Sequence, residues 1–333
     1  STEQSPLRRD LYSVDYKGKN KQRLTELDGT YSISPSKGMK YYISTFTSAS
    51  EGRLVELRNG KGELIRTLVE NPELNEKLKT LPKKEFFTFT TERGDELTYY
   101  LIYPEDFDAT KRYPVLMTQY SGPGSQQIAN RHTYDWEETL AHNGYIVACC
   151  DARGTGYRGE EFKKLTYGQL GRLEVEDQIS FARYLGSQSW VDADRIGIYG
   201  WSYGGFMALG CALKGEGLFK MAIAVAPVTS WRYYDTIYTE IYNDLPQDNP
   251  KGYDDNSPIN FADKLHDRTS LLIMHGTADD NVHVQNTMEM CHALNKAGKQ
   301  YDMMIYPDQN HSMYPNYAYN IRIKMIQYTL RNL

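Results

Sequence analysis

The sequence Gly-Trp-Ser-Tyr-Gly-Gly at residues 200–205 constrains the fold of this chain more than any other feature. It follows an apolar run, Arg195–Tyr199, that we expect to be a strand, and it precedes a predicted helix beginning near Gly205. A G-x-S-x-G motif between a strand and a helix is typical of a sharp turn that presents a serine hydroxyl at the carboxyl edge of a sheet. The motif therefore predicts that Ser202 is exposed at such an edge as a nucleophile.

The chain from residue 85 onward alternates short apolar runs with helical segments. The expected strands are Phe86–Thr90, Leu97–Tyr103, Val115–Met117, Ile146–Cys150, Ile196–Tyr199, Ala222–Val225, Leu271–Met274 and Met303–Ile305. The expected helices are Trp136–His142, Glu174–Leu185, Gly205–Leu213, Val284–Ala297 and Tyr317–Leu333. This alternation implies a mostly parallel sheet covered on both faces, opened by two antiparallel strands. With the serine turn, it predicts an α/β-hydrolase fold.

Residues 1–75 differ from the rest, because they show short strand-like runs and turns. Asn59-Gly60 lies between two such runs, Leu54–Arg58 and Glu63–Leu68, and strongly indicates a hairpin. An all-β segment this small cannot bury the faces of its strands alone. We therefore expect residues 1–75 to be the C-terminal part of a β-propeller, with a small N-terminal β-subdomain as the alternative. Residues 76–333 would form the α/β-hydrolase domain.

Composition and charge argue against several classes of function. The net charge is -5 and no cluster of Lys and Arg stands out, so we expect neither a nucleic-acid nor a membrane-surface partner. The four cysteines show no zinc-ligand spacing, and the adjacent Cys149 and Cys150 lie in an apolar run that suits a buried strand. We expect no metal, no cofactor and no disulfide framework. The sequence shows no apolar stretch of membrane-spanning length and no signal-peptide pattern.

The order of residues after Ser202 indicates the other catalytic groups. In this fold the acid and then the base follow the nucleophile along the chain. Asp279 and Asp280 both follow the run Leu271–Met274, and position alone leaves the choice between them open. His311 is the candidate base, because it lies between the last expected strand and the last helix. The other histidines precede the serine or the acid, lie in a helix, end a strand or follow the acid too closely.

Two donors for an oxyanion are also predicted. The Tyr203 N–H lies at the expected N-terminus of the helix after Ser202, where developing negative charge is stabilised. Tyr120 follows the run Val115–Met117, at the loop position that supplies the second donor in this fold. From the residues alone, Tyr120 is either a hydroxyl donor or an ordinary turn tyrosine.

Three aromatic residues follow the expected strand Ala222–Val225. Trp231, Tyr234 and Tyr238 are spaced by three and four residues, which predicts that they share one helical face. Such a stripe is either core packing or the wall of a pocket for a flat, apolar side chain.

Several further motifs resemble the dipeptidyl peptidase IV family within the prolyl oligopeptidase group of serine peptidases. They are residues 200–205 (GWSYGG), 226–231 (APVTSW), 238–240 (YTE), 275–283 (HGTADDNVH), 151–156 (DARGTG) and 174–178 (EVEDQ). The likeness spans about residues 80–333, and residues 1–75 resemble the closing part of the family's propeller more loosely. The resemblance implies a member of this family, of bacterial type.

The resemblance also implies roles for individual residues. The implied triad is Ser202, Asp279 and His311, which decides between the two aspartates. The implied oxyanion donors are the Tyr120 hydroxyl and the Tyr203 N–H. The implied proline pocket is lined by Tyr203, Val228, Trp231, Tyr234, Tyr238 and Val282, and Asn281 would touch the substrate backbone.

The implied activity is the release of X-Pro, or X-Ala, dipeptides from peptide N-termini through an acyl-enzyme. In the family, a glutamate pair and an arginine on the propeller anchor the substrate ammonium, and Ile241 stands where members often carry arginine. We therefore expect proline-containing peptides as substrates and further propeller blades of the same gene product as partners, with a homodimer as another partner state. The expected location is periplasmic or secreted. The alternatives are an esterase or acylaminoacyl-type peptidase on the same fold, and a non-catalytic interaction module.

Overall fold

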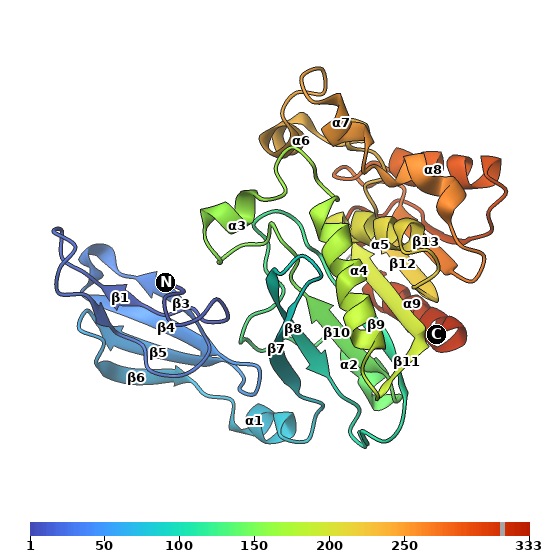
Figure 1. Ribbon diagram of the computed structural model, residues 1–333. Helices are drawn as coiled ribbons and strands as arrows, with labels where there is room; N and C mark the ends of the chain where they lie inside the picture. The colour runs from blue at the N-terminus through green and yellow to red at the C-terminus, as the bar shows by residue number, and fades with distance from the viewer. Residues whose placement is uncertain (314–316) are drawn as a thin grey trace. The chain divides into compact units, whose positions relative to one another are not determined.

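A computed structural model describes residues 1–313 and 317–333 of this chain (Figure 1). The chain forms two compact units. The first contains Ser1–Glu85 and Ile128–Asp135, and the second contains Phe86–Gln127 and Trp136–Leu333. The domain boundary predicted after residue 75 falls inside the helix α1 (Pro72–Leu78).

The first unit is built on an antiparallel sheet in which β3, β4, β5 and β6 are neighbours in that order. Its elements are β1 (Tyr12–Ser13), β2 (Gln22–Arg23), β3 (Thr30–Pro35), the 3-10 helix η1 (Lys37–Met39), β4 (Tyr41–Thr47), β5 (Leu54–Asn59), β6 (Leu64–Val69) and α1. The predicted hairpin is confirmed, because β5 and β6 are antiparallel and the turn begins at Asn59. The Asn59 side chain accepts hydrogen bonds from the backbone N–H groups of Lys61 and Glu63, both at 3.0 Å.

Ile128–Asp135 is held to the first unit by hydrogen bonds that the sequence does not reveal. The Asn130 side-chain oxygen accepts from the Ala49 N–H at 2.8 Å, and its backbone carbonyl accepts from the Thr30 hydroxyl at 2.9 Å. The His132 N–H donates to the Thr47 hydroxyl oxygen at 3.1 Å. This segment is therefore an integral part of the β-rich unit, although it lies between β9 and α2 in the chain.

The second unit contains a sheet whose strand order, among the described residues, is β14-β13-β12-β11-β9-β10-β8-β7. The strands are β7 (Lys84–Thr90), β8 (Glu96–Ile102), β9 (Tyr113–Thr118), β10 (Ile146–Cys150), β11 (Val191–Trp201), β12 (Met221–Val225), β13 (Ser270–Gly276) and β14 (Asp302–Tyr306). The strands from β14 to β10 pair in parallel, and β8 runs antiparallel to β10. The predicted α/β-hydrolase fold with a mostly parallel sheet is confirmed.

Helices cover both faces of this sheet (Figure 1). The helices that pack on its faces include α2 (Glu137–His142), α4 (Leu173–Gly186), α5 (Tyr203–Lys214), α8 (Gln285–Lys296) and α9 (Ala318–Asn332). The other helices of this unit are α3 (Glu160–Lys164), η2 (Trp231–Tyr233), α6 (Thr236–Asn243), α7 (Pro250–Asp254) and η3 (Pro258–Lys264). In β12, Ala222 and Ala224 belong to the core that contains α4, α5 and α8. Met221, Ile223 and Val225 belong to the core that contains α2 and α9. The alternation of side chains along a strand explains this division.

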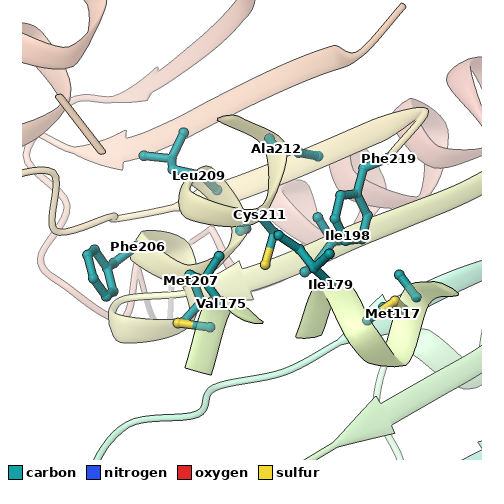
Figure 2. Packing of buried hydrophobic residues seen from close by; sticks show 14 of the residues in the cluster. Met117, Val175, Ile179, Ile198, Phe206, Met207, Leu209, Cys211, Ala212 and Phe219 are labelled. Carbon is teal, nitrogen blue, oxygen red and sulfur yellow. The ribbon is translucent and has the colours of Figure 1, made fainter. Parts of the chain in front are cut away.

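The helix that follows Ser202 is buried along its whole length. Figure 2 shows Met207 and Cys211 of α5 near Val175 and Ile179 of α4, within one apolar cluster. A close-packed core resists shifts of its helices. The N-terminus of α5, and the turn that precedes it, are therefore rigidly supported.

The sequence also led to expectations about the cysteines and about membrane-spanning helices. All four cysteines are buried and free, and Cys149 and Cys150 lie in the buried strand β10 as predicted. Within the described ranges, no helix combines the length and the apolar character needed to cross a bilayer.

Candidate active site

Ser202 lies in a strained turn between β11 and α5. Its backbone angles are φ 62° and ψ -118°, which a residue with a side chain rarely adopts. The neighbouring glycines allow other backbone segments to approach closely. A Cβ atom at Gly204 would lie 2.6 Å from the Gln119 carbonyl oxygen, and one at Gly205 would lie 2.7 Å from that of Val225. A Cβ atom at Gly200, on the other side of the serine, would clash with the Gly204 carbonyl oxygen, so packing requires both glycines of the G-x-S-x-G motif.

Asp279 is the acid that the structure joins to His311. It is buried in the loop after β13, and its Oδ2 lies 2.7 Å from His311 Nδ1. Its Oδ1 accepts from the backbone N–H groups of Asn281 and Val282, at 3.0 and 2.9 Å. Asp280 is exposed instead.

The surroundings of Asp279 favour its ionised form. Burial opposes ionisation, but hydrogen bonds from His275 and His311 outweigh it and hold the pKa of Asp279 well below its usual range. The carboxylate is therefore charged at neutral pH, which keeps a proton on His311 Nδ1 and leaves Nε2 free to accept one.

Sequence reasoning missed the contribution of His275. This residue is fully buried at the end of β13, as predicted, but its Nε2 lies 3.2 Å from Asp279 Oδ2 and 2.7 Å from the Val282 carbonyl oxygen. Its Nδ1 is held by the Thr287 hydroxyl at 2.7 Å. The spacing of four residues between His275 and Asp279, directly after a strand, is the signal that could have revealed this support.

His311 lies in the loop between β14 and α9, as predicted from its position. The Trp201 indole N–H donates to the His311 backbone carbonyl at 3.0 Å, which ties the histidine loop to the residue before Ser202. Among the described contacts, no hydrogen bond joins the Ser202 hydroxyl to the His311 ring. Such bonds commonly tighten only in a substrate complex.

The predicted oxyanion donors come from the loop after β9 and from the first residue of α5. Tyr203 is the first residue of α5, so its N–H belongs to the unpaired group at the helix N-terminus. Burial raises the pKa of Tyr120, and a hydrogen bond with Ser202 lowers it in part, so its hydroxyl stays protonated beside the serine. The Gln119 side chain donates to the Gly204 carbonyl at 2.8 Å and fixes the Tyr120 loop to α5.

The predicted single helical face for Trp231, Tyr234 and Tyr238 is wrong. Trp231 belongs to η2, Tyr234 is extended at its end (φ -110°, ψ 164°), and Tyr238 belongs to α6. The segment contains two separate helix starts. The Ser230 side chain accepts from the Arg232 N–H to cap η2, and the Asp235 side chain accepts from the Tyr238 N–H at 2.7 Å to cap α6.

The three rings nevertheless form one aromatic cluster. Trp231 stacks on Tyr238 with centroids 6.2 Å apart, and Tyr234 meets both edge-on, at 6.0 Å from Trp231 and 5.4 Å from Tyr238. The Tyr203 ring lies 5.5 Å from Trp231. The cluster therefore begins at the residue next to Ser202.

The other predicted pocket residues pack on the same core. Val228 and Val282 are buried in the cluster that contains Tyr203 and Trp231. Asn281 is exposed, and its side-chain oxygen accepts from the Tyr234 hydroxyl at 2.7 Å. The predicted pocket residues thus come from the start of α5, from η2 and α6, and from the loops after β12 and β13.

Two further features bear on where a ligand could bind, namely metal-ligating clusters and a cavity beside α4. In residues 1–313 and 317–333, no group of three or more His, Cys, Asp or Glu side chains is placed to hold a metal ion. A cavity of about 410 Å³ lies beside α4 and contains none of the predicted site residues. Its wall is made of ion pairs such as Arg93 with Glu176 and Arg183 with Glu92, at 3.0 and 3.3 Å.

Known proteins with similar sequences fall into one group. Residues 132–333 match the prolyl oligopeptidase family, and residues 1–51 match the N-terminal region of dipeptidyl peptidase IV. Curated proteins described as "Probable dipeptidyl-aminopeptidase B", from Trichophyton verrucosum and Sclerotinia sclerotiorum, are each 40% identical, over 331 and 323 residues. These alignments cover 96% and 94% of this chain but 36% and 35% of the relatives.

A solved structure gives the same grouping. The crystal structure of Porphyromonas gingivalis dipeptidyl peptidase 4 is 46% identical with a TM-score of 0.97, covering 100% of this chain and 48% of that one. The present chain therefore spans between a third and a half of the length of these relatives.

Proposed function

Because this chain belongs to the prolyl oligopeptidase family, we propose that it is the catalytic part of a serine dipeptidyl peptidase. The reaction is the release of X-Pro or X-Ala dipeptides from the N-terminus of a peptide. Support comes from the chain's similarity to proteins described as a probable dipeptidyl-aminopeptidase and a dipeptidyl peptidase. It also comes from the polar and aromatic groups gathered around the Ser202 turn.

Acylation uses three side chains in sequence. His311 Nε2 takes the proton from the Ser202 hydroxyl as the oxygen attacks the carbonyl carbon of the scissile bond. Asp279, ionised and 2.7 Å from Nδ1, orients the ring and stabilises the imidazolium. The imidazolium then protonates the leaving amine, and the dipeptide remains as an ester on Ser202.

Deacylation repeats these steps with water as the nucleophile. His311 deprotonates the water, which attacks the ester carbonyl, and the proton then returns to the Ser202 oxygen. In both steps the carbonyl oxygen becomes an oxyanion. The Tyr120 hydroxyl and the Tyr203 N–H are the donors that stabilise it, because Tyr120 lies in the loop that Gln119 fixes to α5 and the Tyr203 N–H begins that helix.

Selectivity for proline comes from the aromatic cluster. A pyrrolidine ring is flat and apolar, and it matches a wall formed by Trp231, Tyr234 and Tyr238. Asn281 is exposed at the end of this wall, where it can bind the substrate backbone. We place the groups that bind the substrate ammonium in further propeller blades of the same gene product, as the family resemblance implies.

The observation that carries this proposal is the Asp279–His311 pair on two loops beside a strained Ser202. The test is labelling with a fluorophosphonate probe together with hydrolysis of Gly-Pro-p-nitroanilide. The unmodified chain should be labelled and Ser202→Ala should not, with a complete loss of hydrolysis. A Ser202→Ala variant that retains activity within tenfold of the unmodified chain would contradict the assignment, and an unlabelled but folded chain would indicate a non-catalytic module.

A further inference from the structure

A buried carboxyl group outside the triad contacts the residue next to the nucleophile. Glu174, in the first turn of α4, is completely buried. Its Oε1 accepts a hydrogen bond from the Tyr203 hydroxyl at 2.6 Å, and both carboxyl oxygens accept from the Gly171 N–H at 3.1 Å. An O–H···O distance of 2.6 Å lies in the range of strong, charge-assisted hydrogen bonds.

This carboxyl group is an unusual choice for a core position. Within the described residues Glu174 forms no salt bridge. It interacts electrostatically with Asp177 on the same helix and with Lys214 at the end of α5. Burial raises the pKa of Glu174 to about 7, against the hydrogen bonds from Tyr203 and Gly171 that lower it. A leucine would fill similar space without this desolvation cost. The hydrogen bonds from the Tyr203 hydroxyl and the Gly171 N–H therefore account for a glutamate here, and the one from Tyr203 is the shorter.

The Tyr203 ring is shared between the nucleophile turn and the aromatic cluster. Its centroid lies 5.5 Å from that of Trp231 and 5.9 Å from that of Tyr120. Its backbone N–H is a proposed oxyanion donor. Tyr203 therefore has two proposed roles: its ring lines the pocket, and its N–H stabilises the oxyanion. The only side-chain hydrogen bond found for this phenol in the described residues is the one to Glu174.

We infer that Glu174 is a positioning residue, which holds the Tyr203 ring in place as a wall of the pocket beside Ser202. The inference rests on the proposed function, because it deepens the assignment of the aromatic cluster as the proline pocket. Without the carboxyl acceptor, the buried phenol is left unpaired and its ring shifts to find another partner. A proline side chain, which fills the pocket, is more sensitive to that shift than the smaller alanine.

The test compares Gly-Pro-p-nitroanilide with Gly-Ala-p-nitroanilide on Glu174→Leu, Glu174→Gln and Tyr203→Phe. Glu174→Leu should lower kcat/KM for the proline substrate by roughly tenfold and for the alanine substrate by about twofold or less. Glu174→Gln keeps an acceptor and should stay within about threefold of the unmodified chain on both. In the double variant Glu174→Leu/Tyr203→Phe, kcat/KM should fall no further than in the worse single variant, because both substitutions remove the same Tyr203–Glu174 hydrogen bond.

Glu176→Gln is the matched control, since Glu176 lies on the same helix and pairs with Arg93 rather than Tyr203. It should leave both substrates unchanged. Equal losses on proline and alanine for Glu174→Leu, or losses that multiply in the double variant, would overturn the inference.

Near-ultraviolet circular dichroism gives a readout that needs no activity. Glu174→Leu and Tyr203→Phe should change the aromatic spectrum, and Glu176→Gln should not. If the unmodified chain hydrolyses neither substrate, the proposed function fails. An unchanged spectrum in Glu174→Leu would then overturn the inference separately.

Discussion

The indole N–H of Trp201 donates a 3.0 Å hydrogen bond to the backbone carbonyl of His311. The residue before the proposed nucleophile thus holds the loop of the proposed base, although 110 positions separate them in the chain. This bond couples the two loops whose relative position decides whether a proton can pass from Ser202 to the imidazole.

Trp201→Phe removes this bond and keeps an aromatic ring. We expect kcat for Gly-Pro-p-nitroanilide to fall by roughly fivefold to tenfold with little change in KM, because the lost bond orients a catalytic group. Steady-state kinetics measures the two parameters. Trp190→Phe is the control, since Trp190 packs on Tyr103 and Phe107 outside the site. A Trp201→Phe variant that changes only KM would show that the bond does not position the base.

His311→Ala should reduce kcat about as severely as Ser202→Ala, since members of a triad act as a unit. His283→Ala should retain most activity, because His283 is exposed and follows the acid loop. Stopped assays over long incubations quantify both variants. If the two histidine variants exchanged their effects, His283 would be the base and the assignment from chain order would be wrong.

Tyr120→Phe should lower kcat by roughly 10²–10³ while the chain stays folded, which is the usual loss for one oxyanion donor. The motivation is the position of Tyr120 in the loop after β9, which the Gln119 side chain fixes to α5. Tyr319→Phe, at an exposed site on α9, serves as the comparison and should be silent. An unaltered kcat in Tyr120→Phe would assign the second donor to another group.

Glu174 should make stability depend on pH. Its pKa rises from 4.5 in the unfolded chain to about 7 in the folded one, so the folded state holds the proton more tightly between these values. Below pH 4.5 both states are protonated and nothing is lost. Above pH 7 both are ionised, and the folded state bears the full cost of the buried charge. The free energy of unfolding, relative to Glu174→Gln, should therefore fall by about 3 kcal/mol as the pH rises through this window.

Urea unfolding at pH 5 and pH 8 measures this difference. The titratable groups that interact with Glu174 include Asp177, Tyr203, Lys214 and Tyr238. They remain in both proteins and cancel in the comparison. A difference between the two proteins that is the same at both pH values would mean that Glu174 does not titrate in this range.

Much of the fold and of the candidate site could be predicted from local sequence. The motif around Ser202 requires a strand, a turn and a helix in fixed order, and α5 begins at Tyr203 accordingly. The order of residues along the chain predicted that His311 lies in the loop before the last helix, and there its Nδ1 lies 2.7 Å from Asp279 Oδ2. These features depend on contacts that the fold class itself determines.

The parts that could not be predicted depend on capping and on distant contacts. Spacing alone suggested one helix for Trp231 to Tyr238, but the caps at Ser230 and Asp235 start two separate helices. The bond from Tyr203 to Glu174 joins residues 29 positions apart, and no local pattern encodes it. The docking of Ile128–Asp135 onto the β-rich unit is likewise visible only in three dimensions.

The carboxylate of Asp279 has one further consequence. One of its oxygens forms a hydrogen bond with the His311 imidazole, and the other accepts hydrogen bonds from the backbone N–H groups of Asn281 and Val282. Asn281 in turn receives the Tyr234 hydroxyl. The same loop therefore holds both the proposed proton-transfer pair and a residue of the proposed substrate pocket. Substitutions at residues 281 and 282 that are meant to change the proposed substrate preference should therefore also disturb the Asp279–His311 pair. Variants with a new preference should arise more readily from substitutions in η2 and α6.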